Sequence, residues 1–304
     1  FPYITFLILP PLRHIFLRWN NMAKHTILHA EHELLGAVFD INSQTGYEIP
    51  ISYGTSASAE GEKTSEAECC LFDVSGHTYQ LISGSLAPSL ISDIFAGPVL
   101  DIGDLSFQPV FTGDGAVVSV ALVARSGDNE YFYLDVSNHG GLLSSCIAKY
   151  LFEKKREGAS SETVSLEDAD QLLVPLFLAG PRAHEVLSDY LNDAQSALPP
   201  IGKLSFCLLD ARIAALIGHV PLKDLDAYIV LVNPQQVQIL WRSLLSFPMV
   251  VPIGEADLMR ILSHELSWLS ASHNVDEVSI SQDIHNVHGF VRSSRDFIGG
   301  QALQ

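Results

Sequence analysis

The sequence predicts an α+β fold of two or more packed units, each with its own strands and helices. The chain has 304 residues, and 47% of them are apolar, which is enough to bury a large core. Strand-like apolar runs alternate with stretches typical of amphipathic helices. The same mixture returns after a polar, acidic stretch near residue 165. We therefore expect one unit over 22–165 and a second over 166–304.

The first unit begins with a short amphipathic helix over 29–36 that ends at glycine. Strand and turn follow over 37–53, and a loop then runs into a helix that ends near Cys70. The clearest hairpin surrounds Gly113-Asp114-Gly115, because an Asp-Gly step tolerates the positive φ of tight turns. Further strands are expected over 71–75, 77–83, 107–112, 116–125 and 131–137, followed by a helix over 142–157 and a surface loop over 159–170.

The second unit repeats this mixture of elements. Strands are expected over 172–179, 206–209, 212–218 and 228–232, and helices over 183–191, 234–245 and 257–268. The two units are therefore similar in their elements, although their sequences show no clean repeat.

Charge and cysteine content argue against several classes of function. The 35 acidic and 17 basic side chains give a net charge of −18, which opposes binding to nucleic acid or to an anionic membrane. The four cysteines show no paired CxxC spacing, so neither a zinc site nor a disulfide framework is expected. We expect reduced, buried thiols in a cytoplasmic protein, with no metal and no nucleic-acid or membrane partner.

Residues 1–21 need a separate interpretation, because they run apolar to Leu12 before Arg13 and Arg18. The apolar run is too short for a single membrane-spanning helix. Its positive charges follow it, whereas those of a secretory signal come first. We expect translated upstream sequence, with a membrane anchor as the alternative, and a native start at Met22.

Four short motifs carry a family resemblance. They are Gly46-Tyr47-Glu48-Ile49-Pro50-Ile51-Ser52-Tyr53, Leu71-Phe72-Asp73-Val74-Ser75, Leu178-Ala179-Gly180-Pro181-Arg182-Ala183 and Asp296-Phe297-Ile298-Gly299-Gly300-Gln301-Ala302-Leu303. In this order they resemble the aminomethyltransferase (T-protein) family of the glycine cleavage system. The resemblance implies α+β domains around a central cavity that holds tetrahydrofolate. It also implies a C-terminal barrel domain, which we expect to be absent because the chain stops at Gln304.

The resemblance also implies a reaction, in which a lipoylated carrier protein gives a methylene group to tetrahydrofolate and ammonia is released. The catalytic positions are altered here. Ser119 and Val120 replace a pair of aspartates, one of which lies beside the reacting folate nitrogen in the family. A carboxylate stabilises developing positive charge at that nitrogen, and valine does not. No catalytic residue is therefore expected.

The cofactor contacts that the resemblance implies are only partly kept. They fall on Phe107, Val120, Asp135, Asp226, Tyr228 and Trp268. Phe107 replaces a tyrosine, Asp135 replaces an asparagine, and Ile229 replaces a glutamate that holds the pterin. Three functions stay open: a folate-binding one-carbon transferase, a non-catalytic binding or scaffold paralogue, and a folate-dependent demethylase.

Other candidate sites have simpler interpretations. His29 and His32, which share a helix, are expected to be exposed to solvent rather than to bind a metal. His264-Glu265 is expected to be an ordinary pair on a helix surface, and Lys154-Lys155-Arg156 a solvated basic turn. Cys69-Cys70 are expected to be buried thiols ahead of a strand.

Overall fold

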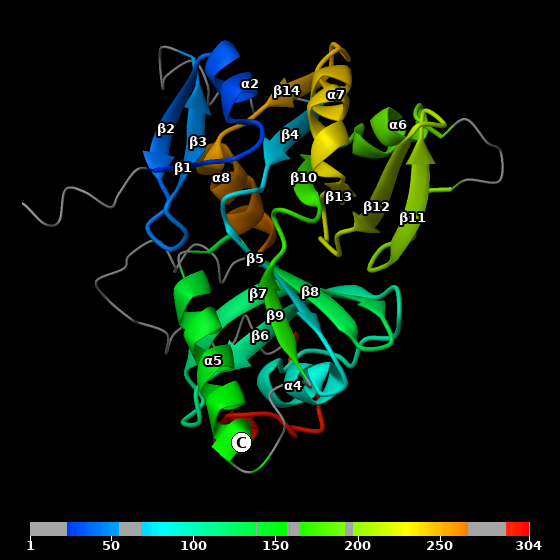
Figure 1. Cartoon of the computed structure of the whole chain (residues 1–304). Coiled ribbons are helices and arrows are strands. Elements are labelled where there is room, and N and C mark those ends of the chain that lie inside the picture. The colour runs from blue at the N-terminus through cyan, green and yellow to red at the C-terminus, as the bar shows by residue number, and fades with distance from the viewer. Residues whose placement is uncertain are drawn as a thin grey trace, which may run out of the picture.

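The computed structural model describes residues 23–54, 68–137, 139–156, 158, 164–191, 197–266 and 290–303. Three sheets form its framework (Figure 1). Sheet A is small and has the order β1-β3-β2, from β1 (Lys24–His25), β3 (Tyr47–Tyr53) and β2 (Ala37–Ile41). Helix α2 (His29–Leu34) connects β1 to β2.

Sheet B has six strands, and its order mixes the two halves of the chain. The order is β11 (Leu204–Leu209), β12 (Ile213–His219), β13 (Ala227–Val232), β10 (Val174–Ala179), β4 (Cys69–Asp73) and β14 (Val250–Pro252). Only the β4–β14 pair is parallel. Apolar residues of α6 (Ala183–Ser188) and α7 (Pro234–Leu244), including the fully buried Trp241, cover one face of this sheet.

Sheet C is antiparallel throughout, with the order β6 (Leu105–Phe111), β7 (Val117–Gly127), β8 (Glu130–Asp135), β5 (Thr78–Ser83) and β9 (Ser165–Asp168). Helices α4 (Ala87–Ile94) and α5 (Gly140–Arg156) cover its outer face, where Leu90 and Leu143 are fully buried. The positive charges at the end of α5 match the negative end of the helix dipole.

The uncovered faces of sheets B and C share one apolar core. Phe72 and Phe177 enter it from sheet B, and Leu122 and Leu134 enter it from sheet C. Helix α8 (Glu255–Glu265) adds apolar side chains to this shared core and packs its first turn against β3. A short 3-10 helix, η4 (Gly300–Leu303), follows near the chain end. The order of layers is therefore helices, sheet B, sheet C and helices. A site between the two sheets would be lined by their facing side chains.

The predicted α+β class is confirmed, and most predicted strands and helices occur close to their expected bounds. Two predictions are wrong. Cys69 and Cys70 lie in strand β4 rather than at a helix end, and the expected surface loop contains β9. The rest of the loop and helix expected ahead of Cys70, residues 55–67, lies outside the described residues. The division near residue 165 stays a prediction, since β4 from the first half pairs with β10 from the second. Among the described residues, no helix has the length and apolar character needed to cross a lipid bilayer.

Candidate functional site

A small cavity lies in the core shared by sheets B and C. Its volume is about 30 Å³, enough for about two water molecules. Its lining consists of Val74, Phe107, Val120, Leu122, Leu134, Val136, Phe177, Val220, Leu258, Leu262 and Leu266. Phe107 and Val120 are among the cofactor contacts that the resemblance implies. The structure therefore brings these two together, and it surrounds them with apolar side chains.

Successive side chains of a strand point to opposite faces of the sheet, and this determines which of the predicted residues reach the cavity. On β7, Val120 and Leu122 point inward, whereas Ser119 contacts Asp135 on the outer face of sheet C. On β8, Leu134 points inward, and the next residue, Asp135, points outward. The two positions where the resemblance implies aspartates therefore lie on opposite faces of one strand.

Asp135 is the centre of a buried polar cluster on that outer face. The Ser119 hydroxyl donates to its Oδ2 at 2.5 Å. The Ser137 hydroxyl and backbone N–H donate to its Oδ1 at 2.6 and 2.8 Å. Burial raises the pKa of the Asp135 carboxyl, and these hydrogen bonds act against that effect. The cluster satisfies its own polar groups and contributes nothing to the cavity lining.

Asp226 and Tyr228 also lie away from the cavity lining. The Asp226 carboxylate is 2.8 Å from the His219 Nε2 atom. Tyr228 is fully buried in the core between sheet B and its two helices, where its hydroxyl lies 2.8 Å from the His184 Nδ1 atom. Its ring stacks on His219 with the ring centres 4.3 Å apart. Burial, followed by the charge of Asp226, raises the pKa of the Tyr228 hydroxyl.

The described residues that line this cavity offer a pterin no side-chain hydrogen-bonding group. A pterin has a polar edge, and each buried polar group left unpaired costs about 1–3 kcal/mol. Ile229, where the resemblance implies a glutamate, is buried in the same apolar core. Ligand pockets commonly measure about 300–1,000 Å³, far more than this cavity. Trp268, the sixth predicted contact, lies outside the described residues.

The predicted exposure of the two helical histidines is wrong. His32 is fully buried, with its Nε2 atom 2.9 Å from Asp73 Oδ2 and its Nδ1 atom 2.8 Å from the Tyr53 hydroxyl. Asp73 also accepts a hydrogen bond from the Ser75 hydroxyl at 2.5 Å. His32 therefore joins α2 to β4 and β3, while His29 turns toward a different carboxylate, that of Glu48.

The remaining candidates are structural. Cys69 and Cys70 are free and buried, and they point to opposite faces of sheet B. Burial raises the pKa of the Cys69 thiol to about 12 and that of Cys70 to about 11, which suppresses the reactive thiolate. His264 is exposed, while the Glu265 carboxylate accepts the backbone N–H groups of Lys223 and Asp224 at 3.1 and 2.9 Å.

The sequence interpretation missed a larger polar pocket where sheets A and C meet. It has a volume of about 230 Å³ and is lined by Lys24, Gln44, Thr45, Tyr47, His77, Thr78, Tyr79, Gln80, Gly141, Ser144, Asp168 and Asp170. Asp170 is buried, and its Oδ1 atom has no hydrogen-bond partner among the described residues. Burial, followed by the charge of Asp168, raises the pKa of Asp170 to about 7. The acidic residues within 167–170 are the signal that the sequence offers for this pocket, but their polar surroundings predict a surface loop.

Comparison with known proteins places this geometry in context. Residues 28–277 match the family model described as the GCVT N-terminal domain. The aminomethyltransferase of Saccharopolyspora erythraea is 23% identical over 224 residues, a stretch that covers 73% of this chain and 57% of that enzyme. The aminomethyltransferase of Corynebacterium aurimucosum is 23% identical over 291 residues, covering 92% of this chain and 74% of that enzyme.

A solved structure shows the same fold. The glycine cleavage system aminomethyltransferase T of Bartonella henselae superimposes with a TM-score of 0.64 at 18% sequence identity. The superposition covers 92% of this chain and 73% of that one. This chain thus spans between about half and three quarters of the length of these proteins.

Proposed function

This chain belongs to the GCVT N-terminal domain family, and from that premise we propose that it is a non-catalytic member. It keeps the folate-domain fold as a binding or scaffold module and does not transfer one-carbon units. The observation that supports this proposal most strongly is the lining of the cavity between sheets B and C, which is apolar at every residue that the structure describes there. Val120, where the resemblance implies an aspartate, is part of that lining.

The energetics favour a core over a ligand site. The lining residues include the aromatic rings of Phe107 and Phe177 and leucines from β7, β8 and α8, all of which gain stability by leaving water. A folate in this position would have to open the core and leave its own polar edge unpaired. A lost acid-base group also costs about 10²–10⁴-fold in rate. Both effects oppose one-carbon transfer.

The alternative is a folate-dependent transferase or demethylase, which rests on family membership. The family is one of folate-binding domains, and the curated relatives are aminomethyltransferases. Under that alternative, tetrahydrofolate and a lipoylated carrier protein would be the partners. This alternative requires polar side chains that hydrogen-bond to the pterin ring, and the described residues that line the cavity do not supply them.

Calorimetric titration of the full chain with tetrahydrofolate tests the proposal. The Bartonella henselae aminomethyltransferase serves as the positive control. A Val120→Ile variant serves as the internal control, because its added methyl group occupies the cavity. We expect no heat of binding from the folded chain under conditions where the positive control binds. Micromolar binding that weakens in Val120→Ile would overturn the proposal and favour the transferase.

A further inference from the structure

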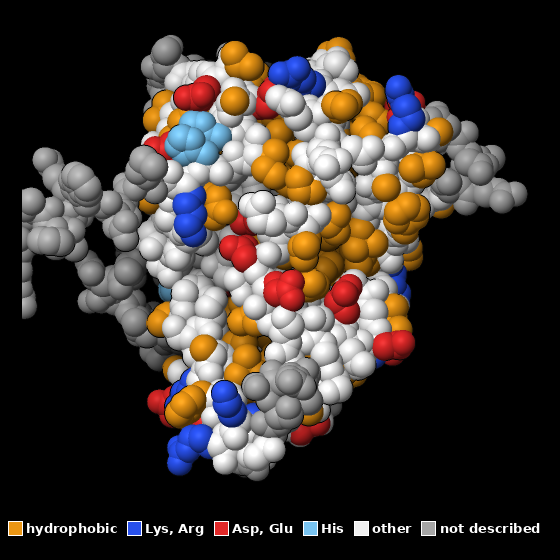
Figure 2. Space-filling model, viewed as in Figure 1, with side chains coloured by type: hydrophobic (Ala, Val, Ile, Leu, Met, Phe, Trp, Pro, Cys, Tyr) orange, Lys and Arg blue, Asp and Glu red, His pale blue; other side chains and the backbone are white. Residues whose placement is uncertain are grey.

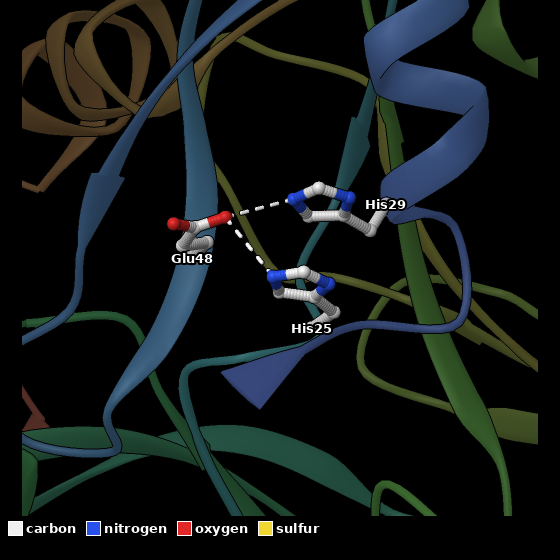
Figure 3. A group of neighbouring side chains, drawn as sticks. All are labelled: His25, His29 and Glu48. Atoms are coloured by element: carbon white, nitrogen blue, oxygen red, sulfur yellow. Dashed lines mark hydrogen bonds and ion pairs between the residues drawn. The ribbon is translucent and has the colours of Figure 1, made fainter. Parts of the chain in front are cut away.

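His25, His29 and Glu48 bring their side chains together at the edge of sheet A (Figure 3). The His29 Nε2 atom is 2.9 Å from Glu48 Oε2, and the His25 Nε2 atom is 3.3 Å from the same oxygen. One potential ligand atom from each residue lies within 4.8 Å of the other two. Both imidazoles therefore present a nitrogen to one point beside the carboxylate.

Strand pairing fixes two of these residues. In the parallel β1–β3 pair, His25 lies opposite Glu48, and the preceding Lys24 lies opposite Tyr47. Because side chains alternate along a strand, the Lys24–Tyr47 pair lies on the other face. There the Lys24 ammonium sits 5.1 Å from the centre of the Tyr47 ring. The positive charge of Lys24 is therefore directed away from the His25–Glu48 pair.

His29 is held by its surroundings. Its ring lies between two others, 3.9 Å from His25 at an angle of 6° and 4.5 Å from Phe39 at an angle of 19°. Its Nδ1 atom is 3.9 Å from the carboxylate of Glu33, one turn further along α2. That separation is too long for a hydrogen bond, so the packing of the neighbouring rings is what orients His29. His29 is buried, so its position does not depend on solvent.

We propose that His25, His29 and Glu48 form a binding site for a divalent first-row metal ion, with Zn²⁺ as the best match. Two imidazoles and a carboxylate are ligands that Zn²⁺ accepts readily. Ligand bonds of about 2.0–2.1 Å place neighbouring ligand atoms about 3.3 Å apart in a tetrahedron and about 2.9 Å apart in an octahedron. The separations of 2.9 and 3.3 Å from Glu48 Oε2 lie close to these spacings, and a small shift of the exposed His25 ring would bring both to the single spacing that one ion requires.

The site opens to solvent on one side. The His25 side chain is 57% exposed and that of Glu48 is 30% exposed, so water would complete the coordination. Figure 2 shows histidine surface at the corner of the molecule where β1 and α2 lie. The ion would join β1, α2 and β3, and so it would fix a strand of only two residues to the sheet. This inference is independent of whether the chain binds folate.

Competition with a chromophoric zinc chelator tests the proposal on the full chain. We expect one Zn²⁺ per chain with a Kd in the micromolar range or tighter. Separate substitutions His25→Ala and Glu48→Gln are each expected to weaken binding at least about tenfold. His25 is largely exposed, so its loss leaves the fold intact. His264→Ala, which removes an exposed histidine beside Glu265, is the matched control and is expected to bind as the wild type does.

Two further readouts make the result independent of chelator chemistry. Co²⁺ is expected to give visible absorption in the wild type that is lost in His25→Ala. At a concentration near the wild-type Kd, Zn²⁺ is expected to raise the Tm of the wild type by more than that of His25→Ala, since a ligand that binds only the folded state stabilises it in proportion to its affinity. Absence of zinc binding by the folded wild type would overturn the proposal. So would equal zinc binding by the wild type and both site variants.

Discussion

Individual buried carboxylates carry much of the polar structure of this protein, and Asp170 differs from the others. Asp73 and Asp135 are surrounded by hydrogen-bond donors. Asp170 is also buried, yet its Oδ1 atom has no partner among the described residues and Asp168 lies close enough to repel its charge. Ionising Asp170 is therefore costly in the folded state, which is why its pKa is raised to about 7.

We expect Asp170→Asn to stabilise the protein at pH 8 but not at pH 4. Between about pH 4 and pH 7 the folded state holds a proton on Asp170 that the unfolded state has released, so wild-type stability falls as pH rises through this window. Asparagine removes that dependence. The gain in unfolding free energy at pH 8, relative to pH 4, should be on the order of 1–4 kcal/mol. Urea unfolding of both proteins at the two pH values measures it.

Asp128→Asn is the matched control, because it makes the same change at an exposed side chain whose charge is not among those that raise the pKa of Asp170. Its effect on unfolding free energy should stay within about 0.5 kcal/mol at either pH. Equal pH dependence of stability in Asp170→Asn and wild type would contradict the assignment of a raised pKa to Asp170.

At the scale of elements, the long strands could be predicted and the short ones could not. The apolar runs of β7, β10 and β13 are long and begin or end at turns, so local pattern identifies them. β1, β9 and β14 have only two to four residues, and each exists because a distant strand pairs with it. Helix α4 contains a proline, which is compatible with its first turn but obscured the helix in the sequence.

Helix α8 docks on sheet A through a contact that no sequence pattern shows. Gly254 precedes the helix, and a Cβ atom built there would lie 2.2 Å from the backbone carbon and oxygen of Ile51 on β3. We expect Gly254→Ala to lower the unfolding free energy by about 1–3 kcal/mol, because the backbones must separate. Urea unfolding measures the loss. Gly113→Ala, where a Cβ atom meets nothing within 4 Å, should change stability by less than about 0.5 kcal/mol. Similar losses in both variants would contradict close packing at Gly254.

At the scale of the whole molecule, the packing of sheet B against sheet C determines which of the predicted site residues face the same cavity. The resemblance alone led to Phe107 and Val120, which share one cavity. It also led to Asp135 and Tyr228, whose side chains lie in cores on the far faces of these sheets. The face that a strand residue occupies depends on the pairing register and on bulges, such as the irregularity in the β6–β7 pairing. Register and bulges depend on the partner strand, so the sequence of one strand alone does not determine them.

The cluster of His25, His29 and Glu48 could not be predicted for a similar reason. His25 and Glu48 are far apart in the sequence and meet only through the parallel β1–β3 pair. The sequence interpretation paired His29 with His32, its neighbour on α2, because helical spacing was the only geometry available. In the structure, His32 turns to Asp73 and His29 turns to Glu48. Long-range pairing, rather than local spacing, therefore creates the proposed metal site.

Placing a carboxylate at Val120, where the resemblance implies an aspartate, distinguishes a closed core from a ligand cavity. Val120 is 4% exposed, so in a closed core Val120→Asp buries a charge with no partner. The expected loss of unfolding free energy is at least about 3 kcal/mol, measured by urea unfolding. Val38→Asp, at a valine of β2 that is 47% exposed, is the control and should cost less than about 1 kcal/mol. If instead the cavity opens to water and accepts a pterin, the new aspartate would be hydrated. Val120→Asp would then cost no more than Val38→Asp and would gain affinity for tetrahydrofolate, and that pair of results would contradict the non-catalytic assignment.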